Sequence, residues 1–219
     1  MALNAAKVQG NNKDRIAQPD LEAGAYPARL VQVVDFGLQA QRPYQGKDKP
    51  PANEICLVYE MSDVFMVDED GNELPDKPRW VSETIPLHNL AADKAKSTQR
   101  YLALDPQKKF GGDFSKLVGT PVNITIVINQ KDDKKYINIA GITAMRAKDA
   151  DKCPPLVNDA RVFDLDDPNL EVFKTFAEWI QDKIKGNLNY QGSKLQALLE
   201  GKVKDAPPPP PPQEDDKPW

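Results

Sequence analysis

The sequence predicts a mainly β protein centred on a five-stranded Greek-key barrel, with one helix between the third and fourth strands. Two observations indicate this class. Apolar and polar residues alternate in several segments before residue 145, which is the pattern of strands with one buried face. One segment with helical spacing interrupts these strands, and two more such segments follow them. We therefore expect a β fold with two added C-terminal helices.

The first three strands are expected at residues 26–36, 54–61 and 80–87. The first is rich in β-branched residues, which favour strands. In the second, the alternate residues Ile55, Leu57, Tyr59 and Met61 are expected to share one face. A short strand at 64–67 precedes the turn 68–71, whose glycine supplies a positive φ. This pattern predicts a small extra hairpin before the third long strand.

The helix is expected from about residue 91 to 104. Its apolar residues recur every three or four positions, and Pro106 ends it. Residues 122–129 then alternate as a half-buried strand, and 136–143 return after a polar hairpin turn at 131–134. Three strands, a helix and two more strands is the order of the OB-fold, a five-stranded Greek-key barrel.

Composition excludes several kinds of functional site. The chain has 219 residues and a net charge of −4, with one histidine and two cysteines that form no CxxC pair. A zinc cage of Cys and His ligands cannot be built from one such chain. Glycine-rich phosphate loops and long apolar spans are absent from the sequence. Two unpatterned cysteines suit a reducing cytoplasm, and no cofactor or membrane association is expected.

Four regions are expected along the chain. A flexible arm covers 1–23, the barrel covers 24–147, an acidic and helical extension covers 148–201, and a Pro-rich tail covers 202–219. The stretch 148–171 holds three basic and seven acidic residues. Without it, 29 basic and 33 acidic residues fall to 26 of each, so the whole negative excess lies there.

The two C-terminal helices are expected from Asn169 to about Lys185, and from Ser193 to Gly201. Asparagine and serine are preferred N-cap residues. The sequence leaves two arrangements open for these helices. They could pack on the barrel, or they could form a homodimer through Phe176 and Trp179.

The connection after the first strand is the first candidate for nucleic-acid binding. Cations follow phosphates and aromatic rings stack on bases, so interleaved basic and aromatic residues suit single strands. In an OB-fold this connection flanks the oligonucleotide groove. A solvated Pro-rich loop is the alternative. The candidate residues here are Arg42, Tyr44, Lys47 and Lys49.

The turn between the last two strands is the second candidate, with Lys131, Lys134, Lys135 and Tyr136. Trp80 is added because it lies on the polar face of its strand, where a base could stack. The alternative for Trp80 is coverage by the N-terminal arm or the acidic segment. Basic residues of the 91–104 helix could extend the groove or form an ordinary solvated face; these are Lys94, Lys96 and Arg100.

The tail is the third candidate. Six consecutive prolines predict a polyproline II rod of about 19 Å, at about 3.1 Å per residue. The rod would hold a partner-binding tip away from the body, made of Glu214, Asp215, Asp216 and Trp219. A disordered, solubilising end and a ligand for a proline-binding domain are the alternatives.

Residues 26–37, followed by 41–47 and the aromatic-ended tail, resemble the OB-fold single-stranded DNA-binding proteins of bacteriophages and bacteria. The resemblance covers about residues 24–145 and the last seven. It implies a non-enzymatic protein that coats single-stranded DNA during replication, recombination or repair, in the host cytoplasm if the source is a phage. By position, it assigns the groove to Arg42, Tyr44, Lys47, Trp80, Lys131 and Tyr136.

The same resemblance implies that Asp215, Asp216 and Trp219 recruit replication or recombination proteins. The chain departs from the family here, because residues 201–219 carry four acids against three lysines. The tail is therefore less acidic than the family pattern, which weakens the implied recruitment.

Two other functions remain open. A metal-dependent nuclease could use carboxylates near one another in sequence, namely Asp63, Asp68, Asp70 and Glu83. A structural or assembly β-barrel of a virion would share the fold. Salt-dependent binding of oligo-dT, with weak binding of duplex, separates a single-strand binder from both.

Overall fold

The computed structural model describes residues 18–132 and 134–202, so the predicted tail residues Glu214, Asp215, Asp216 and Trp219 lie outside the described residues. The elements in chain order are β1 (Gly24–Gln39), β2 (Ala52–Val67), β3 (Glu73–Pro86), α1 (Lys96–Leu104), the 3₁₀ turn η2 (Phe114–Leu117), β4 (Pro121–Lys131), β5 (Lys134–Ala144), α2 (Ala147–Ala150), β6 (Arg161–Phe163), α3 (Leu170–Lys174), α4 (Glu178–Lys185) and α5 (Lys194–Leu199).

One sheet organises these elements. Its strand order is β3-β2-β1-β4-β5, with antiparallel pairing throughout, and β6 pairs with β1 in parallel. The predicted mainly β class is thereby confirmed. The sheet is not closed, because β3 and β5 contact each other without a ladder between them in the part of the chain described. None of the described helices is long and apolar enough to cross a membrane.

β1 is buried on both faces, and this explains its nearly continuous apolar run. Its pairing with β2 shifts register between Leu30 and Gln32. The side chains around this irregularity point to two different cores. Leu30 and Val33 belong to one core, whereas Val31 and Val34 belong to the other. A strand with a single buried face would alternate apolar and polar residues instead.

The first core lies inside the curved sheet. The second-strand residues Ile55, Leu57, Tyr59 and Met61 all belong to it, which confirms that they share a face. α1 and η2 cover this core, since Tyr101 and Leu117 are fully buried there. Leu21, from the region expected to be a flexible arm, is also part of this core and is 4% exposed.

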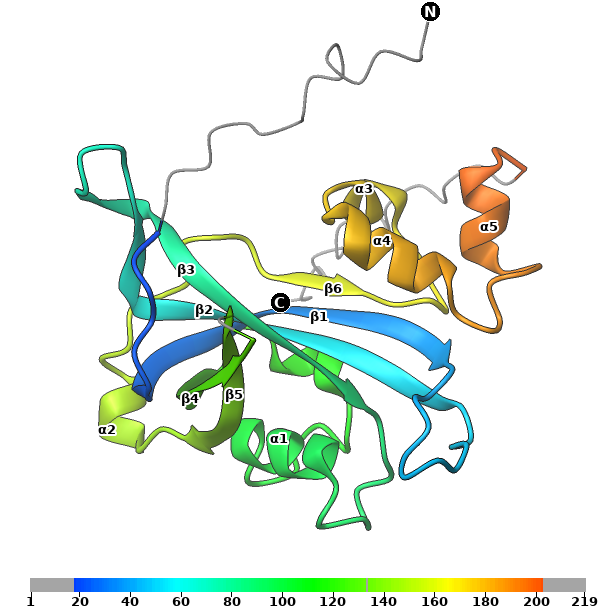
Figure 1. The fold of residues 1–219 in the computed structure, drawn as a ribbon, viewed down its shortest axis with the longest axis horizontal. Helices are drawn as coiled ribbons and strands as arrows, with labels where there is room; N and C mark the ends of the chain where they lie inside the picture. The colour runs from blue at the N-terminus through cyan, green and yellow to red at the C-terminus, as the bar shows by residue number, and fades with distance from the viewer. Residues whose placement is uncertain (1–17, 133, 203–219) are drawn as a thin grey trace, which may run out of the picture.

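The second core lies on the opposite face of β1 and β2, where the C-terminal segment covers the sheet. Figure 1 shows β6, α3, α4 and α5 on one side of β1–β3, with α1, β4 and β5 on the other. The Phe163 ring packs against both Phe173 and Phe176, and all three residues are buried there. The C-terminal helices therefore pack on the sheet, one of the two arrangements that the sequence leaves open.

The predicted helix from Asn169 to Lys185 is two helices. α3 ends at Lys174, and α4 begins at Glu178 after Ala177, whose backbone is extended at φ −59° and ψ 149°. The Thr175 hydroxyl donates to the Val172 carbonyl over 2.7 Å, a local bond that ends α3. The predicted N-caps Asn169 and Ser193 are confirmed, because each side chain accepts a backbone N–H bond.

Two other boundaries differ from the expectations. The helix expected from residue 91 begins at Lys96, because Asn89 holds residues 89–95 in turns by accepting the Ala91 amide at 2.9 Å. The expected extra hairpin is the far end of β2 and β3. These strands continue to Val67 and from Glu73, with register shifts between Glu60 and Phe65 and at Phe65.

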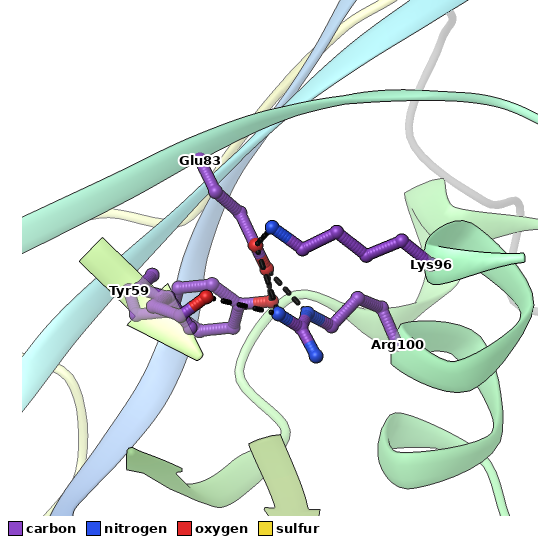
Figure 2. A network of polar contacts seen from close by, with 5 residues as sticks. Tyr59, Glu83, Lys96 and Arg100 are labelled. Carbon is purple, nitrogen blue, oxygen red and sulfur yellow. Dashed lines mark hydrogen bonds and ion pairs between the residues drawn. The ribbon is translucent and has the colours of Figure 1, made fainter. Parts of the chain in front are cut away.

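A buried ion pair spans the opening between β3 and β5. From α1, Arg100 Nε donates to Glu83 Oε1 of β3 over 2.7 Å, and its Nη2 donates to the Ile139 carbonyl of β5 over 3.3 Å. Figure 2 shows Arg100 and Lys96 extending from α1 toward Glu83, with the Tyr59 hydroxyl beside it. α1 thus links the two strands that no ladder joins.

Candidate nucleic-acid interface

The connection between β1 and β2 contains a tight hairpin that presents an aromatic and two cations. Tyr44 and Lys47 exchange both backbone hydrogen bonds, at 2.9 and 3.0 Å. The two residues between them, Gln45 and Gly46, have φ values of 51° and 74°, as a type I′ turn requires. The tyrosine ring is 61% exposed, and Lys49 Nζ lies 4.7 Å from its centroid. A fixed turn therefore holds the ring out in solvent among cations.

All four predicted residues of this connection are exposed: Arg42, Tyr44, Lys47 and Lys49. The hairpin places three of them together, because Tyr44 pairs with Lys47 and contacts Lys49. We call the exposed residues 42–49 the first basic-aromatic loop. Exposure of both the ring and the charges is what contact with a base and a phosphate requires.

The hairpin of β4 and β5 is a second exposed surface of the same kind. Lys131 pairs with Lys134 across the turn, and Asn129 pairs with Tyr136. Tyr136 is 48% exposed, and the neighbouring Ile137 is 42% exposed. We call residues 131–132 and 134–137 the second basic-aromatic loop. Ile137 is exposed although Ile139, two residues along the same strand, is buried.

Lys135 differs from its neighbours because Asp20 neutralises it. The two side chains form an ion pair of 2.7 Å, with both groups exposed. The hydrogen bond from Lys135 lowers the pKa of Asp20, and the same bond raises the pKa of Lys135. Because Asp20 is 115 residues away in sequence, no local pattern indicates this pairing.

The segment around Asp20 also binds the far end of the β2–β3 hairpin. The Gln18 side chain donates to the Val67 carbonyl at 3.1 Å and accepts the Val67 amide at 2.8 Å. Arg79 of β3 donates to the carbonyl of Pro19. Residues 18–20 therefore join the β2–β3 hairpin to the second basic-aromatic loop, which positions that loop.

The two loops lie at opposite ends of β1. The first follows Gln39, at the C-terminal end of the strand. The second extends beyond the pairing of Gly24 with Ile126, at the N-terminal end of β1 (Figure 1). The structure thus brings the predicted residues together as two groups, with the length of β1 and the face of β2 and β3 between them.

Trp80 belongs to neither group. It is half-buried against the second core, and its Nε1 donates to Glu60 Oε2 over 3.1 Å. The same carboxylate accepts the Val157 amide at 2.6 Å and the Asn158 side-chain amide at 2.7 Å. Glu60 therefore fixes both the tryptophan ring and the chain that leads into β6. The sequence left open that the acidic segment 148–171 covers Trp80. Val157 and Asn158 of that segment bind the same carboxylate as the Trp80 ring, in agreement with this alternative.

The basic residues of α1 have separate roles. Arg100 is 3% exposed and pairs with Glu83, so it fits neither a groove nor a solvated face. Lys96 pairs with Oε2 of the same carboxylate at 2.8 Å. Lys94 precedes the helix and is exposed. The sequence contained a partial indication of this pair. Glu83 alternates with the apolar Val81 and Ile85, so it is expected on a buried face, where a carboxylate needs a cationic partner.

Two of the four carboxylates considered for a metal, Asp68 and Glu83, are held by other partners. Asp68 accepts the Asp70 and Asn72 amides at 3.0 and 2.8 Å, and these backbone bonds lower its pKa. Glu83 is bound to Arg100. Within residues 18–132 and 134–202, no group of three or more His, Cys, Asp or Glu side chains could hold a metal ion.

The two cysteines are separate and buried. Cys56 is fully buried in the second core, and burial raises the pKa of its thiol to about 12. Cys153 lies 3.3 Å from the Ser62 hydroxyl. Neither thiol is therefore placed as a nucleophile, because that role needs an exposed or activated thiolate.

Known proteins add no assignment to this geometry. No family model matches the chain, and no curated protein matches it.

Proposed function

We propose that this protein has an OB-fold and that it binds single-stranded DNA without sequence specificity, protecting the strand during replication, recombination or repair. The observation that carries the proposal is the pair of exposed basic-aromatic loops. Each combines a solvent-exposed tyrosine, Tyr44 or Tyr136, with lysines from the same turn. Such a combination follows a phosphate backbone with cations and stacks bases on rings.

Three features of the sheet support the OB-fold. β1 pairs with β2 over Ala28–Gln39 and with β4 over Gly24–Arg29, so it contributes to both halves of the sheet. α1 lies between β3 and β4 in the chain and bridges β3 to β5 through Arg100. The two loops follow β1 and β4, and these are the loops that flank the oligonucleotide face in OB-folds.

Charge distribution supports binding despite the net charge of −4. The negative excess lies in residues 148–171, whereas the two loops carry exposed lysines. Local potential governs a binding surface more than net charge does. Because Lys135 is paired with Asp20, we expect Arg42, Lys47, Lys49, Lys131 and Lys134 to carry most of the phosphate contacts.

Fluorescence anisotropy of labelled oligo-dT, titrated at two salt concentrations, tests the proposal. Affinity should fall as salt rises, with a slope of about −0.7 in log K against log salt for each phosphate contact. The double variant Lys47→Ala/Lys131→Ala should reduce this slope, whereas Lys148→Ala, an exposed lysine outside both loops, is the matched control. Absence of binding at low salt would overturn the proposal.

A further inference from the structure

A groove crosses the outer face of the sheet beside Trp80. One cross-strand row forms its floor: Gln32 of β1 pairs with Arg161 of β6 on one side and with Val58 of β2 on the other. Val58 in turn pairs with Ser82 of β3. All four residues line the groove, and so does Trp80, two positions from Ser82 on the same face of β3. The floor therefore spans four strands.

The break between α3 and α4 forms the wall. Thr175, Phe176 and Ala177 of the break line the groove, together with Trp179 and Ile180 of α4. A continuous helix would carry these side chains on different faces. The groove has a volume of about 320 Å³, within the range of about 300–1,000 Å³ found for small-molecule pockets.

Both tryptophans are held in place while leaving ring surface to the groove. Trp80 is anchored by the bond from its Nε1 to Glu60. The Trp179 ring meets Phe36 edge-on, with centroids 6.3 Å apart and planes at 71°, and the residue is still 51% exposed. Rings that are fixed and accessible can stack a base at a low entropic cost.

Gln32 brings a polar side chain to the groove. The residue is 3% exposed and lines the groove, and its side-chain amide forms no hydrogen bond with the residues that the structure describes. This amide offers both a donor and an acceptor, the two kinds of group that the edge of a nucleobase presents.

Arg161 supplies a cation at the same place. Its NH1 donates to the Thr175 hydroxyl over 3.3 Å, which ties the floor to the wall. Two tryptophans, an unpaired amide and a guanidinium thus line one groove in the described part of the chain. This set matches a nucleotide, which combines a flat ring, a polar edge and a phosphate.

We propose that this groove binds one nucleotide of the single-stranded DNA, with its base against Trp80 and Trp179, its edge on Gln32 and its phosphate toward Arg161. The assignment rests on the proposed function and adds a binding position outside the two basic-aromatic loops. It places DNA contacts on the C-terminal segment, since Arg161 and Trp179 come from β6 and α4.

The full chain carrying Trp219→Phe tests the groove, because Trp80 and Trp179 are then the remaining tryptophans. Labelled oligo-dT is added while anisotropy reports binding and tryptophan emission reports the groove. We expect binding to quench the emission. Adding Trp179→Ala should weaken affinity about tenfold, within the range measured for one stacked base. Adding Gln32→Leu, which keeps the buried volume filled, should also weaken affinity.

Phe110→Ala is the matched control, because Phe110 is 43% exposed and does not line the groove. It should change neither signal. Trp179→Ala replaces an exposed residue, and a far-ultraviolet circular dichroism spectrum equal to that of the parent establishes its fold.

Three results would overturn the inference. If anisotropy shows binding while emission is unchanged and Trp179→Ala keeps the parent affinity, the groove does not hold the strand, and the proposed function stands. If thymidine monophosphate alone quenches as strongly as oligo-dT, the groove is a mononucleotide site. If anisotropy shows no binding at low salt, the proposed function fails and the inference fails with it.

Discussion

Replacing Arg100 by methionine is expected to open the junction between β3 and β5. Arg100 is 3% exposed, and its guanidinium makes three bonds, to both oxygens of Glu83 at 2.7 and 3.1 Å and to the Ile139 carbonyl at 3.3 Å. Methionine fills similar space without a donor. Glu83 would then remain buried, and Lys96 would be its remaining cation.

The expected loss of unfolding free energy is about 3 kcal/mol. Removing one partner of a buried ion pair costs about 3–5 kcal/mol, because the other charge stays buried and unpaired. The lower end applies here, since Lys96 lies 2.8 Å from Glu83 Oε2 and its side chain is 46% exposed, so it can follow the carboxylate. Lys96→Met itself should cost less, about 1 kcal/mol, because the Lys96 side chain is half-exposed and Arg100 remains bound to the carboxylate.

Urea denaturation followed by circular dichroism measures the loss. The double variant Glu83→Leu/Arg100→Met should be more stable than Arg100→Met, because it leaves no buried charge behind. A loss below about 1 kcal/mol for Arg100→Met would refute the argument that this pair joins the two strands. A double variant that is less stable than Arg100→Met would refute the role assigned to the buried charge.

Three further outcomes are expected. Burial raises the pKa of Asp35, so its favourable contribution to stability is complete below about pH 4 and is lost as pH rises through the raised pKa. Asp35→Asn should therefore unfold at the same or a higher urea concentration at pH 7, and a lower one would contradict this. Because burial raises the pKa of Cys56 to about 12, a thiol reagent at pH 8 should label Cys56 only after denaturation, and labelling of the native thiol would contradict its placement. Tyr44→Ala and Tyr136→Ala should each weaken oligo-dT binding about tenfold with an unchanged salt slope, whereas a changed slope would show that the rings act through charge.

The sequence predicted most of the sheet because strand periodicity is a local signal. The shared face of Ile55 to Met61 and the N-caps Asn169 and Ser193 are confirmed. The broken helix at residues 175–177 was missed, because the apolar spacing continues through the break. The break combines the local bond from the Thr175 hydroxyl with packing on the sheet, where Phe176 is buried against Phe163.

The site was predictable in part. The sequence predicted a connection with interleaved cations and a tyrosine, and these residues are exposed, whereas the tight turn at Gln45 and Gly46 was not predicted. The pairing of Asp20 with Lys135 and the cover over Trp80 depend on segments far apart in sequence. The apolar run of β1 could have predicted the second core. A nearly continuous apolar strand is buried on both faces, so a second layer must cover it, and the C-terminal segment is that layer.

Binding of oligo-dT measured by anisotropy at low and high salt, beside a duplex of equal length, tests the central claim most directly. The account predicts binding of the single strand at low salt, an affinity that falls with salt, and much weaker binding of the duplex. Equal affinity for both nucleic acids would contradict a single-strand binder. No binding of oligo-dT at low salt would contradict the account as a whole.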